Sequence, residues 1–223
     1  MSIPLSANGS VVLVAITKSR PGPLPAGPLG TPRLIDTSRS SGGFVVVVET
    51  DVDWSTAPTE SLEWLAPRAI HFDDLARACT SAGVLPFRFG IAFSSEHDLL
   101  AHLDSRSVAI QRELDRLDGR HEYRVGVSID RSDPSASASG ADYLRRRRSE
   151  IRDGRTELDE LRHDLESASS AVHYTSIAEA QMSVAVLCGA DEWAEVSAVL
   201  RRSTATVEYE GPLPPYHFVA LDE

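Results

Sequence analysis

The sequence predicts an α+β protein made of two small α/β-sandwich domains. Short β-branched or alternating segments recur along the chain, and amphipathic helical segments separate them. A polar stretch of small residues divides the chain beyond its middle. The length of 223 residues is enough for two such domains, residues 1–132 and 133–223.

The first two strands are expected near the start of the chain. Residues 11–16 (VVLVAI) and 44–49 (FVVVVE) are apolar runs rich in β-branched residues, which is typical of buried strands. The two runs are candidates to pair with each other. The prolines and glycines of residues 21–32 exclude regular structure, so we expect a loop between the strands.

Two helices and an extended segment follow. A helical pattern covers residues 59–82, with Pro67 as an interruption and with one apolar face formed by Phe72, Leu75, Ala76 and Cys79. Residues 85–93 are then expected to be extended. The next helix begins after Ser95, a suitable N-cap, and Gly119 ends it. Its apolar positions are Leu99, Leu103, Ile110, Leu114 and Leu117.

Residues 121–129 alternate in polarity and predict a half-buried strand. One side carries Tyr123, Val125, Val127 and Ile129, and the other side carries Glu122, Arg124, Gly126 and Ser128. We therefore expect Glu122 on the solvent side. The small polar residues of 130–140, with one proline, predict the domain linker.

The second half begins with a long charged helix, residues 142–167, with apolar residues every seven positions: Leu144, Ile151, Leu158 and Leu165. This seam either forms a coiled coil or lies across its own domain. Gly154 and the short length favour the second alternative. Strands are then expected at 182–188 and 204–210, with a further strand near 172–177 and a short helix capped by Asp191 between the first two.

The C-terminal segment 211–219 (GPLPPYHFV) is rich in proline and aromatic residues and cannot be helical. One interpretation of this segment is a disordered extension. We expect docking instead, because Tyr216 and Phe218 would bury a large area and the prolines lower the entropy lost. The docking surface is either on this chain or on a partner.

Composition excludes several classes of partner. The formal net charge of −11 disfavours binding to nucleic acid or anionic lipid. The one basic cluster, residues 145–148 (RRRR), has no interleaved aromatic residues and reads as a solvated helix face. No apolar stretch is long enough to span a membrane. Two isolated cysteines and the absence of a signal peptide predict a cytoplasmic protein.

Catalytic and metal-binding motifs are missing from the sequence. The seven histidines are scattered, and no HExxH, CxxC or GxSxG motif occurs. No glycine-rich phosphate loop is present either. We therefore expect no enzyme activity, no metal and no cofactor.

One residue stands out in the segment GVLPFRFGIAF, residues 83–93, where a charged arginine lies among apolar neighbours. In a strand, Phe87, Phe89 and Ile91 would point to one side, and Arg88 and Gly90 to the other. We expect Arg88 to be held by a carboxylate or by carbonyls at the domain junction. This structural role ranks above a direct partner contact.

Four segments carry motifs of one family. Residues 84–93 (VLPFRFGIAF) resemble the V-L-P-x-R-F-G-T-x-F stretch of the gas vesicle F/L-type accessory proteins. Residues 114–127 (LDRLDGRHEYRVGV) resemble their L-x-x-L-x-G-x-x-E-[WY]-x-V-x-V stretch. Residues 140–144 (GADYL) match their G-x-x-Y-L, and residues 211–219 resemble their G-P-W-P-P-Y-x-F-V terminus. Leu213 stands where the family has tryptophan, and Ala92 where it has threonine.

The resemblance implies a two-domain α+β protein whose first domain is a variation on a ferredoxin-like fold. It also implies a non-enzymatic role in gas vesicle formation, with binding to the small hydrophobic shell protein or to other accessory proteins. It places the protein in the cytoplasm, associated with gas vesicles. The interaction residues that it suggests are Leu85, Pro86, Phe87, Arg88, Phe89, Gly90, Glu122, Tyr123, Tyr143, Leu144, Gly211, Pro212, Pro214, Pro215, Tyr216 and Phe218.

Two alternatives to the accessory role stay open. A ferredoxin-like ligand-binding regulatory module would have a concave pocket with convergent polar groups. An enzyme of unrecognised type would have titratable residues clustered in one cleft. Fold resemblance alone does not separate these functions.

Overall fold

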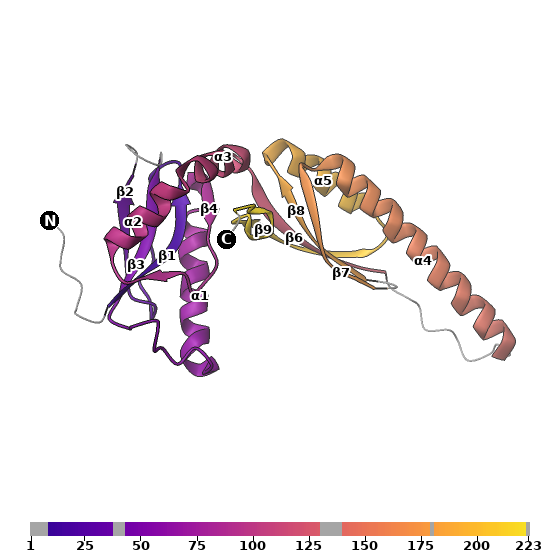
Figure 1. Cartoon of the computed structure of the whole chain (residues 1–223). Coiled ribbons are helices and arrows are strands. Elements are labelled where there is room, and N and C mark those ends of the chain that lie inside the picture. The colour runs from indigo at the N-terminus through magenta and orange to yellow at the C-terminus, as the bar shows by residue number, and fades with distance from the viewer. Residues whose placement is uncertain (1–8, 38–42, 130–139, 179–180, 222–223) are drawn as a thin grey trace. The chain divides into compact units, whose positions relative to one another are not determined.

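The computed structural model describes residues 9–37, 43–129, 140–178 and 181–221 (Figure 1). Within these, the side chains of residues 140–144, 146, 147, 150 and 151 are not described. The chain forms two compact units. The first unit consists of Met1–Gly119 and Pro214–Glu223, and the second unit is Arg120–Leu213. Each has an antiparallel sheet with helices packed on it, which confirms the predicted α+β class.

The division between the units differs from the expected boundary after residue 132. Strand β6 (His121–Ser128), expected in the first domain, pairs with β8 (Gln181–Cys188) and β9 (Thr206–Leu213). Alternating polarity identifies a strand but not its partners, because pairing is a long-range property. The expected linker lies mostly outside the described residues, and β6 and α4 (Gly140–Ala168) on either side of it both belong to the second unit.

The first unit is built on a sheet in the order β2-β3-β1-β4, with β5 also paired to β1. The strands are β1 (Ser10–Thr17), β2 (Thr31–Asp36), β3 (Phe44–Thr50), β4 (Val84–Pro86) and β5 (Ala92–Phe93). The predicted strands β1 and β3 are confirmed, and they pair antiparallel. Strand β2 was not predicted, because its sequence TPRLID contains a proline and charges. Its place at the edge of the sheet tolerates both.

Helices cover both faces of this sheet (Figure 1). Helix α1 (Leu62–Ala78) packs its residues Phe72, Leu75 and Ala76 against β1 and β3. Helices α2 (Glu96–Ser105) and α3 (Ser107–Leu117) lie on the opposite face, where α2 contacts β1 and α3 contacts β4. Every residue of β1 is therefore buried, which explains why its sequence is continuously apolar.

Pro67 does not interrupt α1 as expected. A proline inside a helix removes one backbone donor. The carbonyl that loses its donor is that of Glu63, four residues earlier, in the exposed first turn of the helix. The helix continues through the proline.

The helix expected from Ser95 to Gly119 is in fact two helices that meet at Arg106. The N-cap Ser95 is confirmed, since its side chain accepts from the Asp98 N–H. Arg106 leaves helical geometry, with φ −114° and ψ 8°. All five apolar positions predicted for this segment are buried. The local pattern thus identified the buried face of the segment. The break at Arg106 results from packing α2 and α3 on different strands.

The second unit has the element order β6-α4-β7-β8-α5-β9, with β7 (Ala171–Ala178) and α5 (Ala190–Arg202) completing it. Its sheet order is β7-β8-β6-β9, and all pairs are antiparallel. This βαββαβ arrangement is the ferredoxin-like motif. The first unit has the same order of its first four strands, with residues 18–30 forming a loop where that motif has its first helix.

Helices α4 and α5 form the core of the second unit with one face of the sheet. Leu158, Leu161 and Leu165 of α4 pack with Val196 and Leu200 of α5 against the strands. In its described part, the seam of α4 therefore lies across its own sheet, as favoured above. The expected cap Asp191 is wrong: Gly189 is the N-cap residue, and Glu192 accepts from its backbone N–H at 2.8 Å.

The predicted exposure of Glu122 is also wrong, because its side chain is fully buried. Its neighbours across the sheet are Leu187 and Leu213, both buried. The Arg124 guanidinium donates to a Glu122 carboxylate oxygen at 3.1 Å. Alternation correctly places Glu122 on the face of β6 opposite Tyr123. It does not show that the side chains at this end of that face are buried.

Candidate functional site

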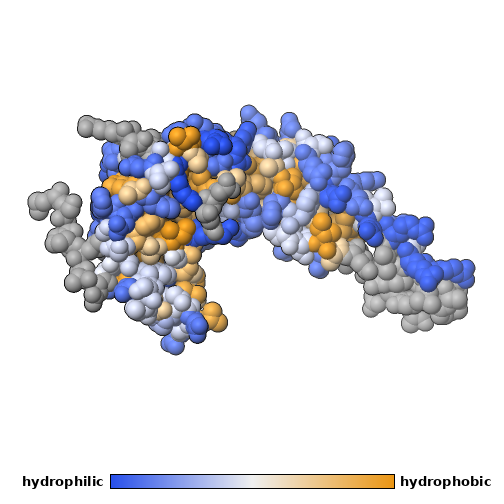
Figure 2. Space-filling view, viewed as in Figure 1, coloured by the Kyte–Doolittle hydropathy of each residue, from blue (hydrophilic) through white to orange (hydrophobic). Residues whose placement is uncertain are grey.

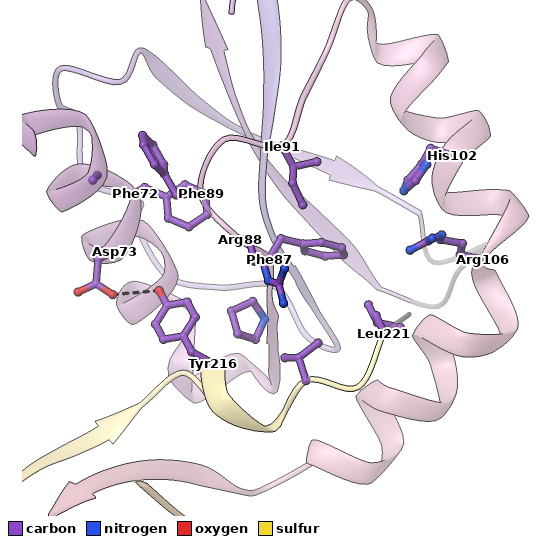
Figure 3. A pocket seen from close by; sticks show the side chains of 13 residues that line it. Phe72, Asp73, Phe87, Arg88, Phe89, Ile91, His102, Arg106, Tyr216 and Leu221 are labelled. Carbon is purple, nitrogen blue, oxygen red and sulfur yellow. Dashed lines mark hydrogen bonds between the residues drawn. The ribbon is translucent and has the colours of Figure 1, made fainter. Parts of the chain in front are cut away.

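Three segments that are distant in sequence meet at one groove of the first unit (Figure 3). They are α1, the loop 87–91 and the C-terminal tail 214–221, and the C-terminal end of α2 with its C-cap Arg106 lines the groove as well. The groove has a volume of about 400 Å³. Its lining is mostly apolar and consists of Ala69, Phe72, Asp73, Pro86, Phe87, Arg88, Phe89, Ile91, His102, Arg106, Tyr216, Val219 and Leu221.

The loop 87–91 is not the continuous strand expected for residues 85–93. The Phe87 N–H donates to the Val14 carbonyl at 3.0 Å, and the Leu13 N–H donates to the Ile91 carbonyl at 3.0 Å. These bonds attach both ends of the loop to β1 where its register shifts between Leu13 and Ala15. Gly90 has φ +100°, which side chains rarely allow. The loop therefore bulges out between β4 and β5.

The loop directs its side chains differently from a strand. Phe89 packs edge-to-face on Phe72 of α1, with ring centroids 5.3 Å apart, and on Trp54 at 5.4 Å. Phe87, Arg88 and Phe89 all line the groove, so the expected alternation of Arg88 against its aromatic neighbours is wrong. Arg88 is exposed. Its expected role at a domain junction stays a prediction.

The tail docks on the first unit of its own chain, as one of the two predicted alternatives. The Tyr216 hydroxyl donates to Asp73 Oδ1 at 2.9 Å (Figure 3). The short 3₁₀ helix η2 (Tyr216–Phe218) follows, and the Ala220 N–H donates to Glu113 Oε2 at 3.1 Å. The Arg116 guanidinium donates to the Phe218 carbonyl. The tail is thus held by side chains of α1 and α3.

Glu113 and Arg116, the two residues of α3 that bind the tail, form an ion pair with each other. Arg116 donates to both carboxylate oxygens of Glu113, at 3.1 Å and 2.7 Å. Glu113 is buried, with only 6% of its surface exposed. The hydrogen bond from Arg116, supported by the Ala220 N–H, holds the pKa of Glu113 below its ordinary value despite burial. Glu113 is therefore ionised at neutral pH and accepts from both the arginine and the tail.

The groove has a positive side on α2 and the loop. Arg88 and Arg106 line it together with His102, whose ring lies 5.2 Å from that of Phe93. The Arg106 side chain makes no hydrogen bond or ion pair within the part of the chain that the structure describes, and it points into the groove (Figure 3). The one carboxylate in the lining, Asp73, already receives Arg77 at 2.6 Å and Tyr216.

An exposed apolar stripe on α1 continues from the groove. We call Leu62, Ala66, Ala69 and Ile70 the α1 stripe. Leu62 and Ile70 are 77% and 63% exposed, and Ala69 belongs to both the stripe and the groove lining. Figure 2 shows hydrophobic surface over the region of α1.

The structure brings some of the family-motif residues together and separates others. Pro86, Phe87, Arg88, Phe89 and Tyr216 line the groove. Leu85, Pro214 and Pro215 are buried in the first unit, Gly90 turns the loop, and Phe218 offers its carbonyl to Arg116. In the second unit, Tyr123 stacks on Trp193 with centroids 3.7 Å apart. The remaining second-unit members are Glu122 in β6, Gly211 and Pro212 in β9, and Tyr143 and Leu144 in α4, the last two without described side chains.

Sequence reasoning missed the half of the site that comes from helices. Asp73, His102 and Arg106 line the groove, and Glu113 and Arg116 hold the tail. The α1 stripe had a detectable signal, because its members are spaced by four, three and one residues on a helix with a second, buried apolar face. The spacing of three residues between Glu113 and Arg116 is a local signal for their ion pair, but no local signal shows that the pair binds the tail, because that contact is long-range.

The described residues contain neither a metal-ligating cluster nor an exposed thiol. They contain no group of three or more His, Cys, Asp or Glu side chains that could hold a metal ion. Both cysteines are buried, and burial raises the pKa of each thiol to about 12. In the same residues, none of the helices is both long and apolar enough to cross a membrane.

Comparisons with known proteins agree with this architecture. Residues 15–220 match the family model described as gas vesicle synthesis protein GvpL/GvpF. The crystal structure of the gas vesicle protein GvpF from Anabaena sp. PCC7120 is similar, with TM-score 0.64 and 15% identity, covering 96% of this chain and 98% of that one. GvpF from Microcystis aeruginosa is similar with TM-score 0.61 and 14% identity, covering 95% and 99%. No curated protein sequence matches the chain.

The two structures share the fold with this chain along nearly its whole length. The family model covers nearly the same residues, including the loop 87–91 and the docked tail. The chain therefore belongs to the GvpL/GvpF family of gas vesicle synthesis proteins.

Proposed function

We propose that this protein is a non-enzymatic accessory factor in gas vesicle formation that binds the small hydrophobic shell protein or another gas vesicle accessory protein. The observation that carries the proposal is an apolar groove joined to an exposed apolar stripe, in a chain of the GvpL/GvpF family. The protein would act in the cytoplasm and at the vesicle.

A hydrophobic shell subunit exposes apolar surface before assembly and would associate with itself. A carrier with a net charge of −11 can cover such a surface and keep the complex dispersed by charge repulsion. The same charge disfavours nucleic acid as a partner. The mostly apolar lining of the groove suits the binding of an apolar protein segment.

A co-expression pull-down tests the proposal. Tagged protein is produced with the shell subunit from the same cell, either as the full chain or ending at Leu213. This truncation removes residues 214–223, which include the docked tail 214–221, but keeps strand β9 complete. We expect the full chain to keep the shell subunit soluble and to co-elute with it, and the truncated chain to retain much less.

The control is Ile177→Ser, which changes an exposed apolar residue of the second unit. It should retain the shell subunit as the full chain does. Precipitation of the shell subunit with every form would exclude direct shell binding. The pull-down is then repeated with each of the remaining gas vesicle accessory proteins of that cell. The proposal fails if none of them co-elutes with the full chain.

One observation favours the second candidate, a ligand-binding regulatory module. The groove is concave, and Arg88, His102 and Arg106 converge on it. At about 400 Å³ it is within the size range of small-molecule sites. Thermal denaturation of the full chain with millimolar hexanoate, a small apolar carboxylate, separates the two functions. A saturable rise in Tm would support the module, and an unchanged Tm would support a groove for protein segments.

A further inference from the structure

We propose that the α1 stripe and the groove form one docking surface for an amphipathic helix of a gas vesicle partner, with its apolar face on the stripe and a carboxylate at Arg106 and Arg88. The inference rests on the proposed function and specifies the chemistry of the partner segment. Its occupant is a helix with an apolar face and an acidic residue at one end of that face.

The stripe has the dimensions of a helix-packing face. Leu62 and Ile70 are eight residues apart, which is about 12 Å along a helix, or two turns. Ala66 and Ala69 lie between them and are small, so a partner helix can approach closely at the centre. The large exposed side chains at the ends and the small ones in the middle form a shallow groove. The side-chain ridges of a second helix can pack into it.

The exposure of the stripe is unusual within the described residues. Their large exposed apolar side chains are Leu62, Ile70, Val108, Ile177 and Tyr209. Two of these five lie on one face of α1, eight residues apart, and that face runs into the groove at Ala69. Scattered apolar residues need no explanation, but a cluster joined to a concave apolar site is typical of an interaction surface.

The positive groups define the charge of the partner. Arg106 has no side-chain partner within the described part of the chain, although it is half-buried and faces apolar walls. Arg88 lines the same space, and Asp73 is already paired with Arg77. A carboxylate can bind a guanidinium through two parallel hydrogen bonds, which adds geometric selectivity. In a chain of net charge −11, this positive site favours an acidic group over a basic one.

The C-terminal tail is part of the groove and leaves its space open. Tyr216, Val219 and Leu221 form one of its walls (Figure 3). The stripe lies on α1, which forms another wall through Ala69, Phe72 and Asp73. A partner helix on the stripe therefore reaches the groove without displacing the tail.

The first test uses the shell subunit in the co-expression pull-down. The double variant Leu62→Ser/Ile70→Ser removes the apolar ends of the stripe, and Arg106→Glu reverses the charge. Either change should reduce the retained shell subunit at least tenfold, and Arg106→Lys should retain an intermediate amount. The controls are Val108→Ser on α3 and Arg152→Glu on α4, both at exposed positions outside the surface. They should bind as the wild type does.

Two outcomes separate this inference from the proposed function. If the wild type retains the shell subunit and the stripe and Arg106 variants retain as much, the docking surface is wrong while the proposed function stands. If the wild type retains no gas vesicle protein, the proposed function fails. Circular dichroism and thermal denaturation show whether each variant is folded, and a variant that unfolds is replaced by Ile70→Thr or Arg106→Gln.

The second test does not need the natural partner. Two 18-residue helical peptides share one leucine and alanine face and carry either glutamate or lysine on the polar face. We expect the glutamate peptide alone to bind the full chain, with NMR amide shifts at α1 and the loop 87–91, and Arg106→Glu to abolish this binding. Equal binding of both peptides, or shifts elsewhere, overturns the inference. The free chain could also form a dimer that the Leu62→Ser/Ile70→Ser variant does not form. That result would assign the stripe to a second copy of the chain and would overturn the inference.

Discussion

The hydroxyl of Tyr216 donates a hydrogen bond to Oδ1 of Asp73 at 2.9 Å, although 143 positions separate the two residues. One belongs to the C-terminal tail and the other to α1, and both line the groove of the first unit. The bond therefore joins the last segment of the chain to α1 at the edge of the groove.

Tyr216→Phe tests this bond directly, because it removes the hydroxyl and keeps the ring. We expect the free energy of unfolding of the first unit to fall by about 1 kcal/mol, the usual net value of one hydrogen bond at a partly exposed site. Urea denaturation followed by the fluorescence of Trp54 and Trp64, in a Trp193→Phe background, measures it.

The matched control is Tyr209→Phe in the second unit. Tyr209 is 60% exposed, and its hydroxyl makes no hydrogen bond within the described residues. Its removal should change the free energy of unfolding of the second unit by less than about 0.5 kcal/mol, followed by Trp193 fluorescence in a Trp54→Phe/Trp64→Phe background. Equal losses for the two variants would contradict a role of the Tyr216 hydroxyl in holding the tail.

Glu113 should make tail docking depend on pH. Its folded pKa lies below the ordinary value of 4.5, because Arg116 and the Ala220 N–H bind the ionised carboxylate. The stabilisation is therefore fully present above pH 4.5 and is lost as the pH falls through the folded pKa. The free energy of unfolding of the wild type should decline over that range.

Glu113→Gln removes this titration. We expect it to destabilise the first unit by about 1–3 kcal/mol at pH 7, since Arg116 loses a buried charged partner. The difference from the wild type should shrink as the pH falls below 4.5. Urea denaturation at pH 3 to 7 measures both curves, and parallel curves would show that Glu113 does not carry the dependence.

Two glycines should respond to alanine in opposite directions. A Cβ at Gly154 in α4 would lie 3.7 Å from Cδ1 of Ile129, an ordinary contact. Gly154→Ala should therefore stabilise the second unit by about 0.5–1 kcal/mol through helix propensity. Gly90 has open space around it but φ +100°, so Gly90→Ala should destabilise the first unit by about 1–3 kcal/mol. Thermal denaturation of each variant checks both signs, and a shift of the same sign in both would contradict the argument.

The two cysteines should be unreactive in the native protein. Cys79 and Cys188 are fully buried, and burial raises both pKa values to about 12, so very little thiolate is present at pH 8. A colorimetric disulfide reagent at pH 8 should detect no thiol in the folded chain and two per chain in guanidinium. Rapid reaction of one thiol before unfolding would show that its unit opens locally.

Much of the fold was predictable from local patterns. The runs at β1, β3 and β8, the alternation at β6 and the helical spacing at α4 follow from periodicity over a few residues. The motif resemblance also identified the family, and it named both the loop 87–91 and the tail before the structure placed them together. Each of these features depends on neighbours within one element or on a short quoted motif.

The remaining features depend on contacts between distant segments. Edge strand β2 carries a weak local signal, and its sequence is tolerated only because β3 pairs with it on one side. The break at Arg106 follows from packing α2 and α3 on different strands, and it directs the Arg106 side chain into the groove. The burial of Glu122 and the assignment of β6 to the second unit likewise depend on which strands pair with it.

The sequence by itself thus determined the α+β class, most elements, the buried face of each helix and the family. Only the tertiary structure decided the boundary between the units, the docking of the tail on α1 and α3, and the groove with its positive side. The physical reason is the range of the interactions involved. Periodicity records which side of an element avoids water, whereas a groove exists only where Ala69, Arg88, Arg106 and Tyr216 are brought together by packing.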